Sequence, residues 1–145
     1  MGSAAERGYI VETMDVVAAF LQSEVEEDVF VRQAPGYEIL DTETGRPLVM
    51  KLKKSIYGLR QSPRKWGTTF AKGIAEIGFI ALKSDPCMYM YGSGPTHAIL
   101  CMHVDDCTLA GKTPSVVKHL KEQLANKFKM TDGGPAILLL GMKIS

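Results

Sequence analysis

Two adjacent carboxylates, Asp105 and Asp106, interrupt an apolar run that spans residues 98–111. Apolar segments on both sides of an Asp-Asp step predict two strands joined by a tight turn, with both acids at its tip. Like charges held this close repel each other unless a cation neutralises them. The pair therefore indicates a site for a divalent metal ion, although an Asp-Asp dipeptide is also an ordinary polar turn.

A third acid, Asp15, ends the apolar segment 9–14 near the start of the chain. Because neighbouring residues of one strand point to opposite faces, a two-metal site needs acids from separate strands. Asp15 supplies the missing carboxylate if its strand lies beside the hairpin. Three carboxylates without a cluster of Cys and His ligands favour hard Mg²⁺ over zinc.

The composition predicts one domain, since a chain of 145 residues that is 46% hydrophobic can bury one core. The formal net charge is +1, which does not by itself indicate a nucleic-acid-binding protein. Residues 51–65 hold six basic side chains and no acid, whereas residues 24–43 hold seven acids and one arginine. Two interpretations stay open: two solvated faces that offset each other, or a basic strip that follows a phosphate backbone.

The three cysteines, Cys87, Cys101 and Cys107, are odd in number and form no CxxC pair. This pattern argues against a disulfide framework and favours a reducing, intracellular compartment. All three lie in predicted strands, where we expect buried thiols that act as small apolar groups. No apolar run is long enough to span a bilayer and no signal peptide is visible, so we expect no membrane partner.

Hydrophobic periodicity and turn residues divide the chain into short elements. Strands are predicted at residues 8–16, 29–31, 48–53 and 87–91, on both sides of the Asp-Asp step, and at 137–144. One helix is predicted with Ser62 as N-cap, Pro63 at its first position and Gly78 as C-cap, and a second opens at Thr113-Pro114 and is broken by residues 131–135. Their apolar faces hold Trp66, Phe70, Ile74 and Ile77 in the first helix, and Val117, Leu120, Leu124 and Phe128 in the second. This order predicts the α+β class, with an antiparallel sheet and two helices packed on one face.

Several motifs resemble the reverse transcriptase of copia-type (pseudoviral) LTR retrotransposons, and they occur in that family's order. They are Met14-Asp15-Val16 with Ala19-Phe20-Leu21, the block from Ser55 to Trp66, Asp85-Pro86-Cys87-Met88-Tyr89, Val104-Asp105-Asp106, and Leu140-Gly141-Met142-Lys143-Ile144. The resemblance runs from about residue 8 to the C-terminus, and the block 55–66 is its most specific part.

The resemblance implies a palm-like domain of a right-hand polymerase over residues 8–145, after a tag or disordered lead at 1–7, with partial fingers and no thumb. It implies RNA-directed DNA polymerase activity that transfers a dNTP to a primer 3′-OH with Mg²⁺ or Mn²⁺. The ligands would be the carboxylates of Asp15, Asp105 and Asp106 and the carbonyl of Val16. The implied partners are an RNA or DNA template-primer and the dNTP, in the cytoplasm within a virus-like particle or in the nucleus.

The resemblance also implies roles for individual residues. Phe20 would act as a sugar gate that excludes a ribose 2′-hydroxyl, although a core aromatic is an equally open interpretation. Gln61 would contact the incoming nucleotide, and Arg60 and Ser62 the nucleic acid. His103 stands where the family usually has Tyr, beside the primer sugar, and Gly141 and Met142 would belong to the primer grip. Trp66 is expected in the core.

Two functions stay open at this point. The first is a polymerase fragment with weak or no activity alone. The second is a non-catalytic, retroelement-derived binding or scaffold protein, which could form a homodimer through apolar surface left uncovered by partial fingers and a missing thumb.

Overall fold

The computed structural model describes residues 8–136, 138–139 and 142–143. Its elements follow one another in this order: β1 (Ile10–Val16), η1 (Ala19–Gln22), β2 (Phe30–Arg32), β3 (Val49–Lys51), α2 (Ser62–Ile77), β4 (Ile80–Ala81), β5 (Met88–Tyr91), η2 (Gly94–Thr96), β6 (Ala98–His103), β7 (Asp106–Gly111), α3 (Pro114–Lys127), β8 (Met130–Pro135), β9 (Leu138–Leu139) and β10 (Met142–Lys143). The α+β class is therefore confirmed.

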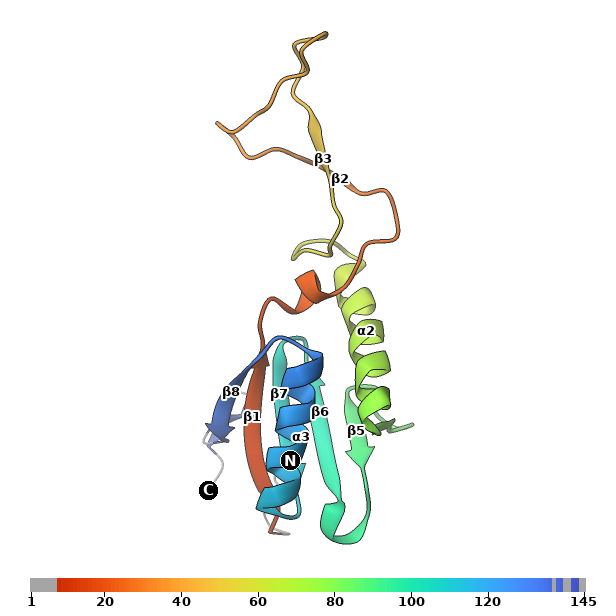
Figure 1. Ribbon diagram of the computed structural model, residues 1–145, viewed down its shortest axis with the longest axis vertical. Helices are drawn as coiled ribbons and strands as arrows, with labels where there is room; N and C mark the ends of the chain where they lie inside the picture. The colour runs from red at the N-terminus through yellow and green to blue at the C-terminus, as the bar shows by residue number, and fades with distance from the viewer. Residues whose placement is uncertain (1–7, 137, 140–141, 144–145) are drawn as a thin grey trace.

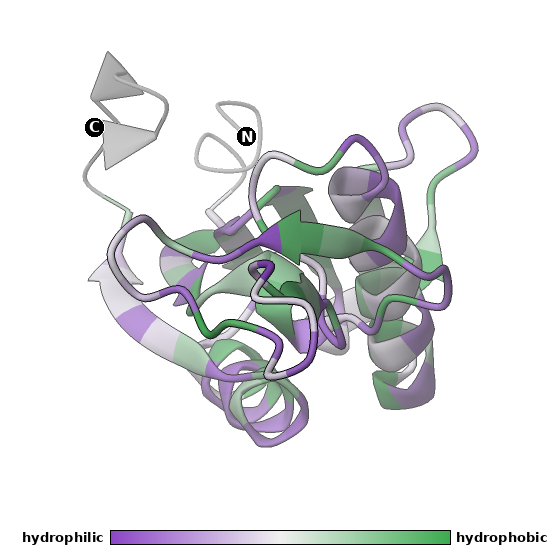
Figure 2. Ribbon diagram, turned by 90° about the horizontal axis from the view of Figure 1, so that it is seen from above, coloured by the Kyte–Doolittle hydropathy of each residue, from purple (hydrophilic) through white to green (hydrophobic). Residues whose placement is uncertain are grey.

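A six-stranded antiparallel sheet with the order β4-β5-β6-β7-β1-β8 forms the body of the protein (Figure 1). Alternate residues of the central strands are buried on one face, among them Met14, Leu100 and Leu109. The buried residues of α2 and α3 join the same cluster, so both helices pack on that face. Figure 2 shows the hydrophobic parts of the strands at the centre of the view, with polar residues on the outer sides of the helices.

Helix α2 buries Trp66, Phe70 and Ile74, as its periodicity predicts. Gly78 is the C-cap with a φ of 108°, a left-handed conformation that glycine adopts without strain. The predicted N-cap is wrong, because Gln61 holds that position and Ser62 begins the helix. The Ser62 hydroxyl instead donates a hydrogen bond to the carbonyl of Ile56 at 2.6 Å, which ties the helix start to the preceding loop.

Helix α3 opens at Thr113-Pro114 as predicted: Thr113 is the N-cap, and its hydroxyl accepts a hydrogen bond from the N–H of Val116. Lys121 lies on its buried face, where its ammonium forms ion pairs with Glu12 of β1 and Asp132 of β8. Burial opposes the positive charge of Lys121, but hydrogen bonds to both carboxylates outweigh it and raise the pKa. The hydrogen bond from Lys121 likewise lowers the pKa of Asp132. This group therefore ties α3 to two adjacent strands.

Two predictions near the C-terminus are corrected. The glycine-rich residues 131–135, expected only to break the helix, lie in β8, which pairs with β1 through a bulge between Thr13 and Met14. The outer edge of β1 supplies hydrogen bonds that outweigh the weak strand preference of glycine. The predicted single strand 137–144 is instead two short antiparallel strands, β9 and β10, as far as its residues are described.

Residues 24–54 form an arm that folds back on itself and projects from the sheet (Figure 1). Its backbone is held by the short pair β2–β3 and by hydrogen bonds such as Leu52 N–H to the Val29 carbonyl. Many of its large apolar side chains are exposed, including Tyr37 at 83% and Ile39 at 67%. Neither helix in the described ranges is long and apolar enough to cross a membrane.

The contact between the two helices depends on a glycine. A Cβ atom at Gly73 of α2 would lie 2.4 Å from the ring of Phe128, which follows α3. That ring cannot easily move, because it stacks on Phe70 at a centroid distance of 5.0 Å and meets Trp66 edge-on. Gly67, which precedes Gly73 in the same helix, has no such neighbour within 4 Å.

We therefore predict opposite effects for the same substitution at two positions of α2. Gly73→Ala should lower the free energy of unfolding by about 1–3 kcal/mol through overpacking. Gly67→Ala should raise it by roughly 0.5–1 kcal/mol, because alanine restricts the unfolded chain and favours the helix. Urea unfolding followed by circular dichroism measures both. Changes of the same sign in the two variants would contradict this account of the helix contact.

Candidate functional site

Asp15 and Asp106 lie directly opposite each other across the antiparallel pair β1–β7. Their neighbours Met14, Val16 and Cys107 are buried under the helices, so both exposed carboxylates belong to the other face. Side chains of directly opposed residues start only about 4.5–5.5 Å apart at Cβ. Strand pairing thus brings together two acids that are far apart in the chain.

Asp105 lies in the turn that joins β6 to β7, together with Val104. The prediction that both acids occupy the tip is corrected here, since Asp106 is already the first residue of β7. Val104 has a φ of 59°, a left-handed conformation that is unfavourable for a β-branched residue. Two hydrogen bonds hold the turn: Val16 N–H donates to the Asp105 carbonyl at 2.8 Å, and the Trp66 indole N–H donates to the Val104 carbonyl at 2.6 Å.

Tyr57 reaches the same turn from the loop before α2. Its hydroxyl donates a hydrogen bond to Oδ2 of Asp105 at 3.2 Å. Partial desolvation, the negative charge and hydrogen bond of Asp105, and the charge of Asp15 together raise the pKa of Tyr57. The phenol therefore stays protonated and serves as a donor beside two of the three aspartates.

Phe20 follows β1 in the short helix η1 and is buried. Its ring packs against Tyr57, with centroids 4.4 Å apart and planes tilted by 52°. Phe20 is thus a core aromatic whose ring also touches Tyr57, and its role as a sugar gate stays a prediction.

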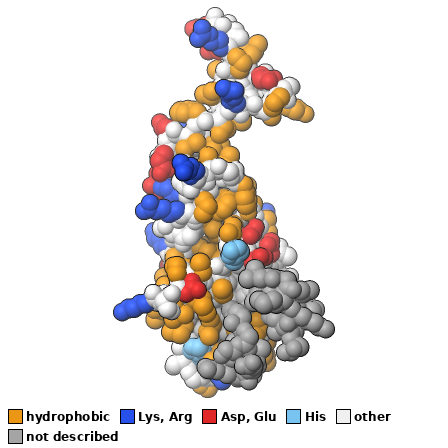
Figure 3. Space-filling view, turned by 180° about the vertical axis from the view of Figure 1, so that it is seen from behind, with side chains coloured by type: hydrophobic (Ala, Val, Ile, Leu, Met, Phe, Trp, Pro, Cys, Tyr) orange, Lys and Arg blue, Asp and Glu red, His pale blue; other side chains and the backbone are white. Residues whose placement is uncertain are grey.

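His103, the last residue of β6, lies opposite Asp106 and is exposed. Asp15, Asp106 and His103 therefore form a row across three neighbouring strands. Figure 3, which views the molecule from behind, shows a histidine beside clustered acidic side chains below the arm. This row marks the end of the sheet at which the 104–105 turn and Tyr57 also lie.

The donor chemistry of this edge suits a hard divalent cation, since three carboxylates come from two strands and a turn. In the described part of the chain, however, no three Asp, Glu, His or Cys side chains converge closely enough to form a ready metal site. One oxygen of Asp105 already accepts the Tyr57 hydroxyl. The backbone thus places the acids near one another, but the side chains as described do not form a metal site.

Other residues with implied roles lie elsewhere or outside the described residues. Arg60 is exposed, whereas Ser62 is buried with its hydroxyl engaged by Ile56. Met142 belongs to β10, and Gly141 lies outside the residues that the structure describes.

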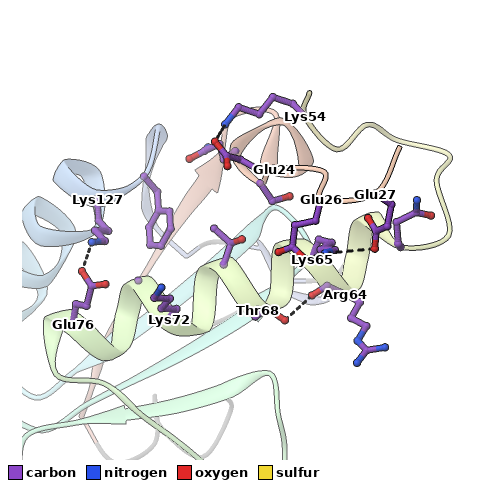
Figure 4. Close-up of a pocket in the computed structure, with 16 residues that line it drawn as sticks. Glu24, Glu26, Glu27, Lys54, Arg64, Lys65, Thr68, Lys72, Glu76 and Lys127 are labelled. Carbon is purple, nitrogen blue, oxygen red and sulfur yellow. Dashed lines mark hydrogen bonds and ion pairs between the residues drawn. The ribbon is translucent and has the colours of Figure 1, made fainter. Parts of the chain in front are cut away.

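Gln61 lines a groove of about 940 Å³ along α2 that includes none of the three aspartates. Charged residues of both signs line this groove, and several of them form ion pairs (Figure 4). Lys65 pairs with Glu26 and Glu27 of the arm, Lys54 pairs with Glu24, and Lys127 pairs with Glu76. A hydrogen bond from Lys65 lowers the pKa of Glu26, and the same contact raises the pKa of Lys65. Half of the basic side chains in residues 51–65, those of Lys51, Lys54 and Lys65, therefore pair with the acidic segment of the same chain.

Residues 1–145 match the family model of reverse transcriptase (RNA-dependent DNA polymerase). The chain belongs to this family. It is 38% identical, over 97% of its length, to a retrovirus-related Pol polyprotein from transposon TNT 1-94 of Nicotiana tabacum, and 30% identical, over 99%, to one from transposon RE1 of Arabidopsis thaliana. In each case the match covers 10% of the polyprotein. A putative transposon Ty5-1 protein of Saccharomyces cerevisiae is 29% identical over 90% of the chain, with 42% of that protein covered.

These matches confirm the resemblance to copia-type elements that the motifs indicated. Tyr57 also belongs to the candidate site, although no role was predicted for it from the sequence of this reverse transcriptase chain. It lies inside the specific block 55–66 and directly before Gly58, whose φ of 95° marks a sharp change of direction. That position in the block is the signal that could have identified it.

The cysteines of this reverse transcriptase chain differ in their surroundings. Cys107 is buried beside Asp106, and burial foremost raises the pKa of its thiol to about 12. It is a buried strand residue that acts as a small apolar group, as predicted. The same prediction is wrong for Cys87, which is exposed in the turn before β5 because the strand begins only at Met88.

The opposed acids lead to a prediction about stability without metal. Asp15→Asn should raise the free energy of unfolding by about 0.2–1 kcal/mol at low salt, because it removes like-charge repulsion across the strands. The gain should shrink in 1 M salt through screening. Thermal and urea unfolding of the metal-free protein measure the effect.

Asp28→Asn is the matched control, since it makes the same chemical change at an exposed ion pair with Lys51 on the arm. That variant should be neutral or slightly less stable. A loss of stability in Asp15→Asn would contradict the repulsion.

Proposed function

We propose that this chain forms the palm-like part of an RNA-directed DNA polymerase, in which Asp15, Asp105 and Asp106 hold Mg²⁺ or Mn²⁺. The observation that carries the proposal is the β1–β7 register, which sets Asp15 opposite Asp106 and next to the turn of Asp105. Membership of the reverse transcriptase family supports it. Because the chain spans about a tenth of the polyproteins it matches, polymerase activity of the whole protein is part of this proposal.

The proposed reaction is nucleotidyl transfer. The primer 3′-hydroxyl gives its proton to solvent, its oxygen forms a bond to the α-phosphorus of a dNTP, the bond from that phosphorus to the bridging oxygen breaks, and pyrophosphate leaves. The divalent cations would supply charge stabilisation and a lowered pKa at the 3′-hydroxyl. The chain's own part is to hold three carboxylates at one sheet edge, with the carbonyl of Val16 as a further oxygen donor.

Residues around the acids would bind the substrates. Phe20, supported by Tyr57, would limit the space at the sugar and so favour deoxynucleotides. His103 stands in the row with the acids and would contact the primer. Arg60 is an exposed cation suited to a phosphate of the template-primer. Gln61, which lines the groove at the start of α2, would contact the incoming nucleotide. Strands β9 and β10, with Gly141 and Met142, would form the primer grip.

The first test of this function is metal binding. Mn²⁺ should raise the melting temperature of the unaltered chain, because a ligand that binds only the folded state stabilises it. Asp105→Asn should remove most of this shift, whereas Asp28→Asn should keep it. Equal Mn²⁺ shifts in all three proteins would reject the assigned ligands.

Activity is the second readout of the same variants. Primer extension on poly(rA)/oligo(dT) with Mn²⁺ should be weak for this chain and absent in Asp105→Asn. Extension that persists in Asp105→Asn would show that the signal does not come from this site.

A second candidate function is a scaffold whose arm binds a second copy of the chain. The exposed apolar side chains of the arm support it, and so do β2 and β3, which pair only with each other among the described strands and leave outer edges free. Ile39→Lys should then shift the protein from dimer to monomer in light scattering at rising concentration. Ile80→Lys, at a residue of β4 that is 71% exposed, is the control and should have no effect. A protein that stays monomeric throughout would exclude this candidate.

A further inference from the structure

We infer that Trp66 is a positioning residue for Asp105: its indole N–H holds the 104–105 turn in a conformation that Val104 disfavours. The effect on metal binding rests on the proposed function. The hydrogen bond from Trp66 to the turn can be tested without any metal. Trp66 touches no substrate in this account, and it acts only through the turn.

The turn has an intrinsic tendency to relax. Two-residue hairpin turns with a positive φ at the first position favour glycine or asparagine there. Here Val104 takes that position with a φ of 59°, and its side chain is 37% exposed. Core packing of the Val104 side chain is thus a minor influence, and we assign the hold on the conformation to hydrogen bonds that the backbone carbonyls of the turn accept.

The hydrogen bond from Trp66 is suited to this role. The donor nitrogen lies 2.6 Å from the Val104 carbonyl oxygen, and the Trp66 side chain is only 1% exposed. The indole meets Phe70 and Phe128 at centroid distances of 5.5 Å and 5.7 Å, so the ring cannot turn its N–H away. A phenylalanine would fill the same core but would leave the carbonyl without this donor.

A second hydrogen bond completes the support of the turn. Val16 N–H donates to the carbonyl of Asp105, the next peptide unit along. One carbonyl is therefore held from helix α2 and the other from strand β1. Between them the backbone of Asp105 is fixed, and its carboxylate meets Tyr57 at the edge of the sheet that holds Asp15 and Asp106.

The chain contains one tryptophan, which makes the bond directly observable. In an NMR spectrum of the unaltered, metal-free protein, the single indole N–H should resonate downfield and exchange slowly with solvent. A random-coil shift with fast exchange would overturn the inference. This measurement needs no variant and does not depend on whether the chain binds metal.

The variant Trp66→Phe tests the consequence for the site. It should keep the circular dichroism spectrum of the fold but weaken Mn²⁺ binding by about two- to tenfold, the factor that one neutral hydrogen bond supplies. Phe70→Leu, in the same cluster but without a bond to the turn, should lose stability and keep its Mn²⁺ affinity. Unchanged Mn²⁺ affinity in Trp66→Phe, with loss in Asp105→Asn, would overturn the inference and leave the proposed function intact.

A double-mutant cycle with Val104 separates the hold on the turn from general packing. Glycine adopts a positive φ freely, so Val104→Gly should make Trp66→Phe less damaging to stability than it is beside valine. Val104→Ala retains a Cβ atom and should give little rescue. Additive effects of Trp66→Phe and Val104→Gly in urea unfolding would overturn the inference. If the unaltered chain does not bind Mn²⁺, the proposed function fails. Non-additive effects of the two substitutions on the free energy of unfolding would still support the role of Trp66 in holding the turn.

Discussion

The register of β1 against β7 is the constraint on which the whole site depends. A slip of one residue would move Asp15 to the face covered by helices, where an unpaired carboxylate is unfavourable. Two features fix the register. The buried pair of Met14 and Cys107 belongs to the core, and Lys121 reaches from α3 to Glu12 of β1. The core side of the sheet thus determines where the acids stand on its open side.

The charges of the arm and of α2 have to be considered together. The acidic segment of the arm pairs with Lys51, Lys54 and Lys65, so these lysines are partly neutralised within the chain. The ion pairs found among the described residues do not include Lys53, Arg60 or Arg64. The observation favours the interpretation of two offsetting charged surfaces for half of the strip, three of its six basic residues. Any phosphate contacts of this strip would therefore rest on few cations, which agrees with the small net charge.

Elements with a clear local pattern could be predicted from the sequence. The helical spacing of Trp66, Phe70 and Ile74 and the apolar runs beside Asp105 and Asp106 determine α2, β6 and β7 almost to the residue. Strand β8 could not be predicted, because its glycines join the sheet only when β1 offers an open edge. Asp106 lies outside the turn because it pairs with both His103 and Asp15, and Ser62 is not the N-cap because its hydroxyl bonds to the Ile56 carbonyl instead. Membership of the reverse transcriptase family came from motif order rather than from any single element.

The fixed spacing of residues in the block 55–66, the most specific part of the family resemblance, has a physical explanation in this structure. Tyr57, near its start, holds the carboxylate of Asp105, and Trp66, at its end, holds the carbonyl of Val104. The Ser62 hydroxyl ties the helix start to Ile56, which keeps the distance between these two contacts constant. A change in the length of the block would move one contact away from the turn while the other stayed. The spacing within the block is therefore set by the geometry of a two-residue turn that lies on another part of the chain.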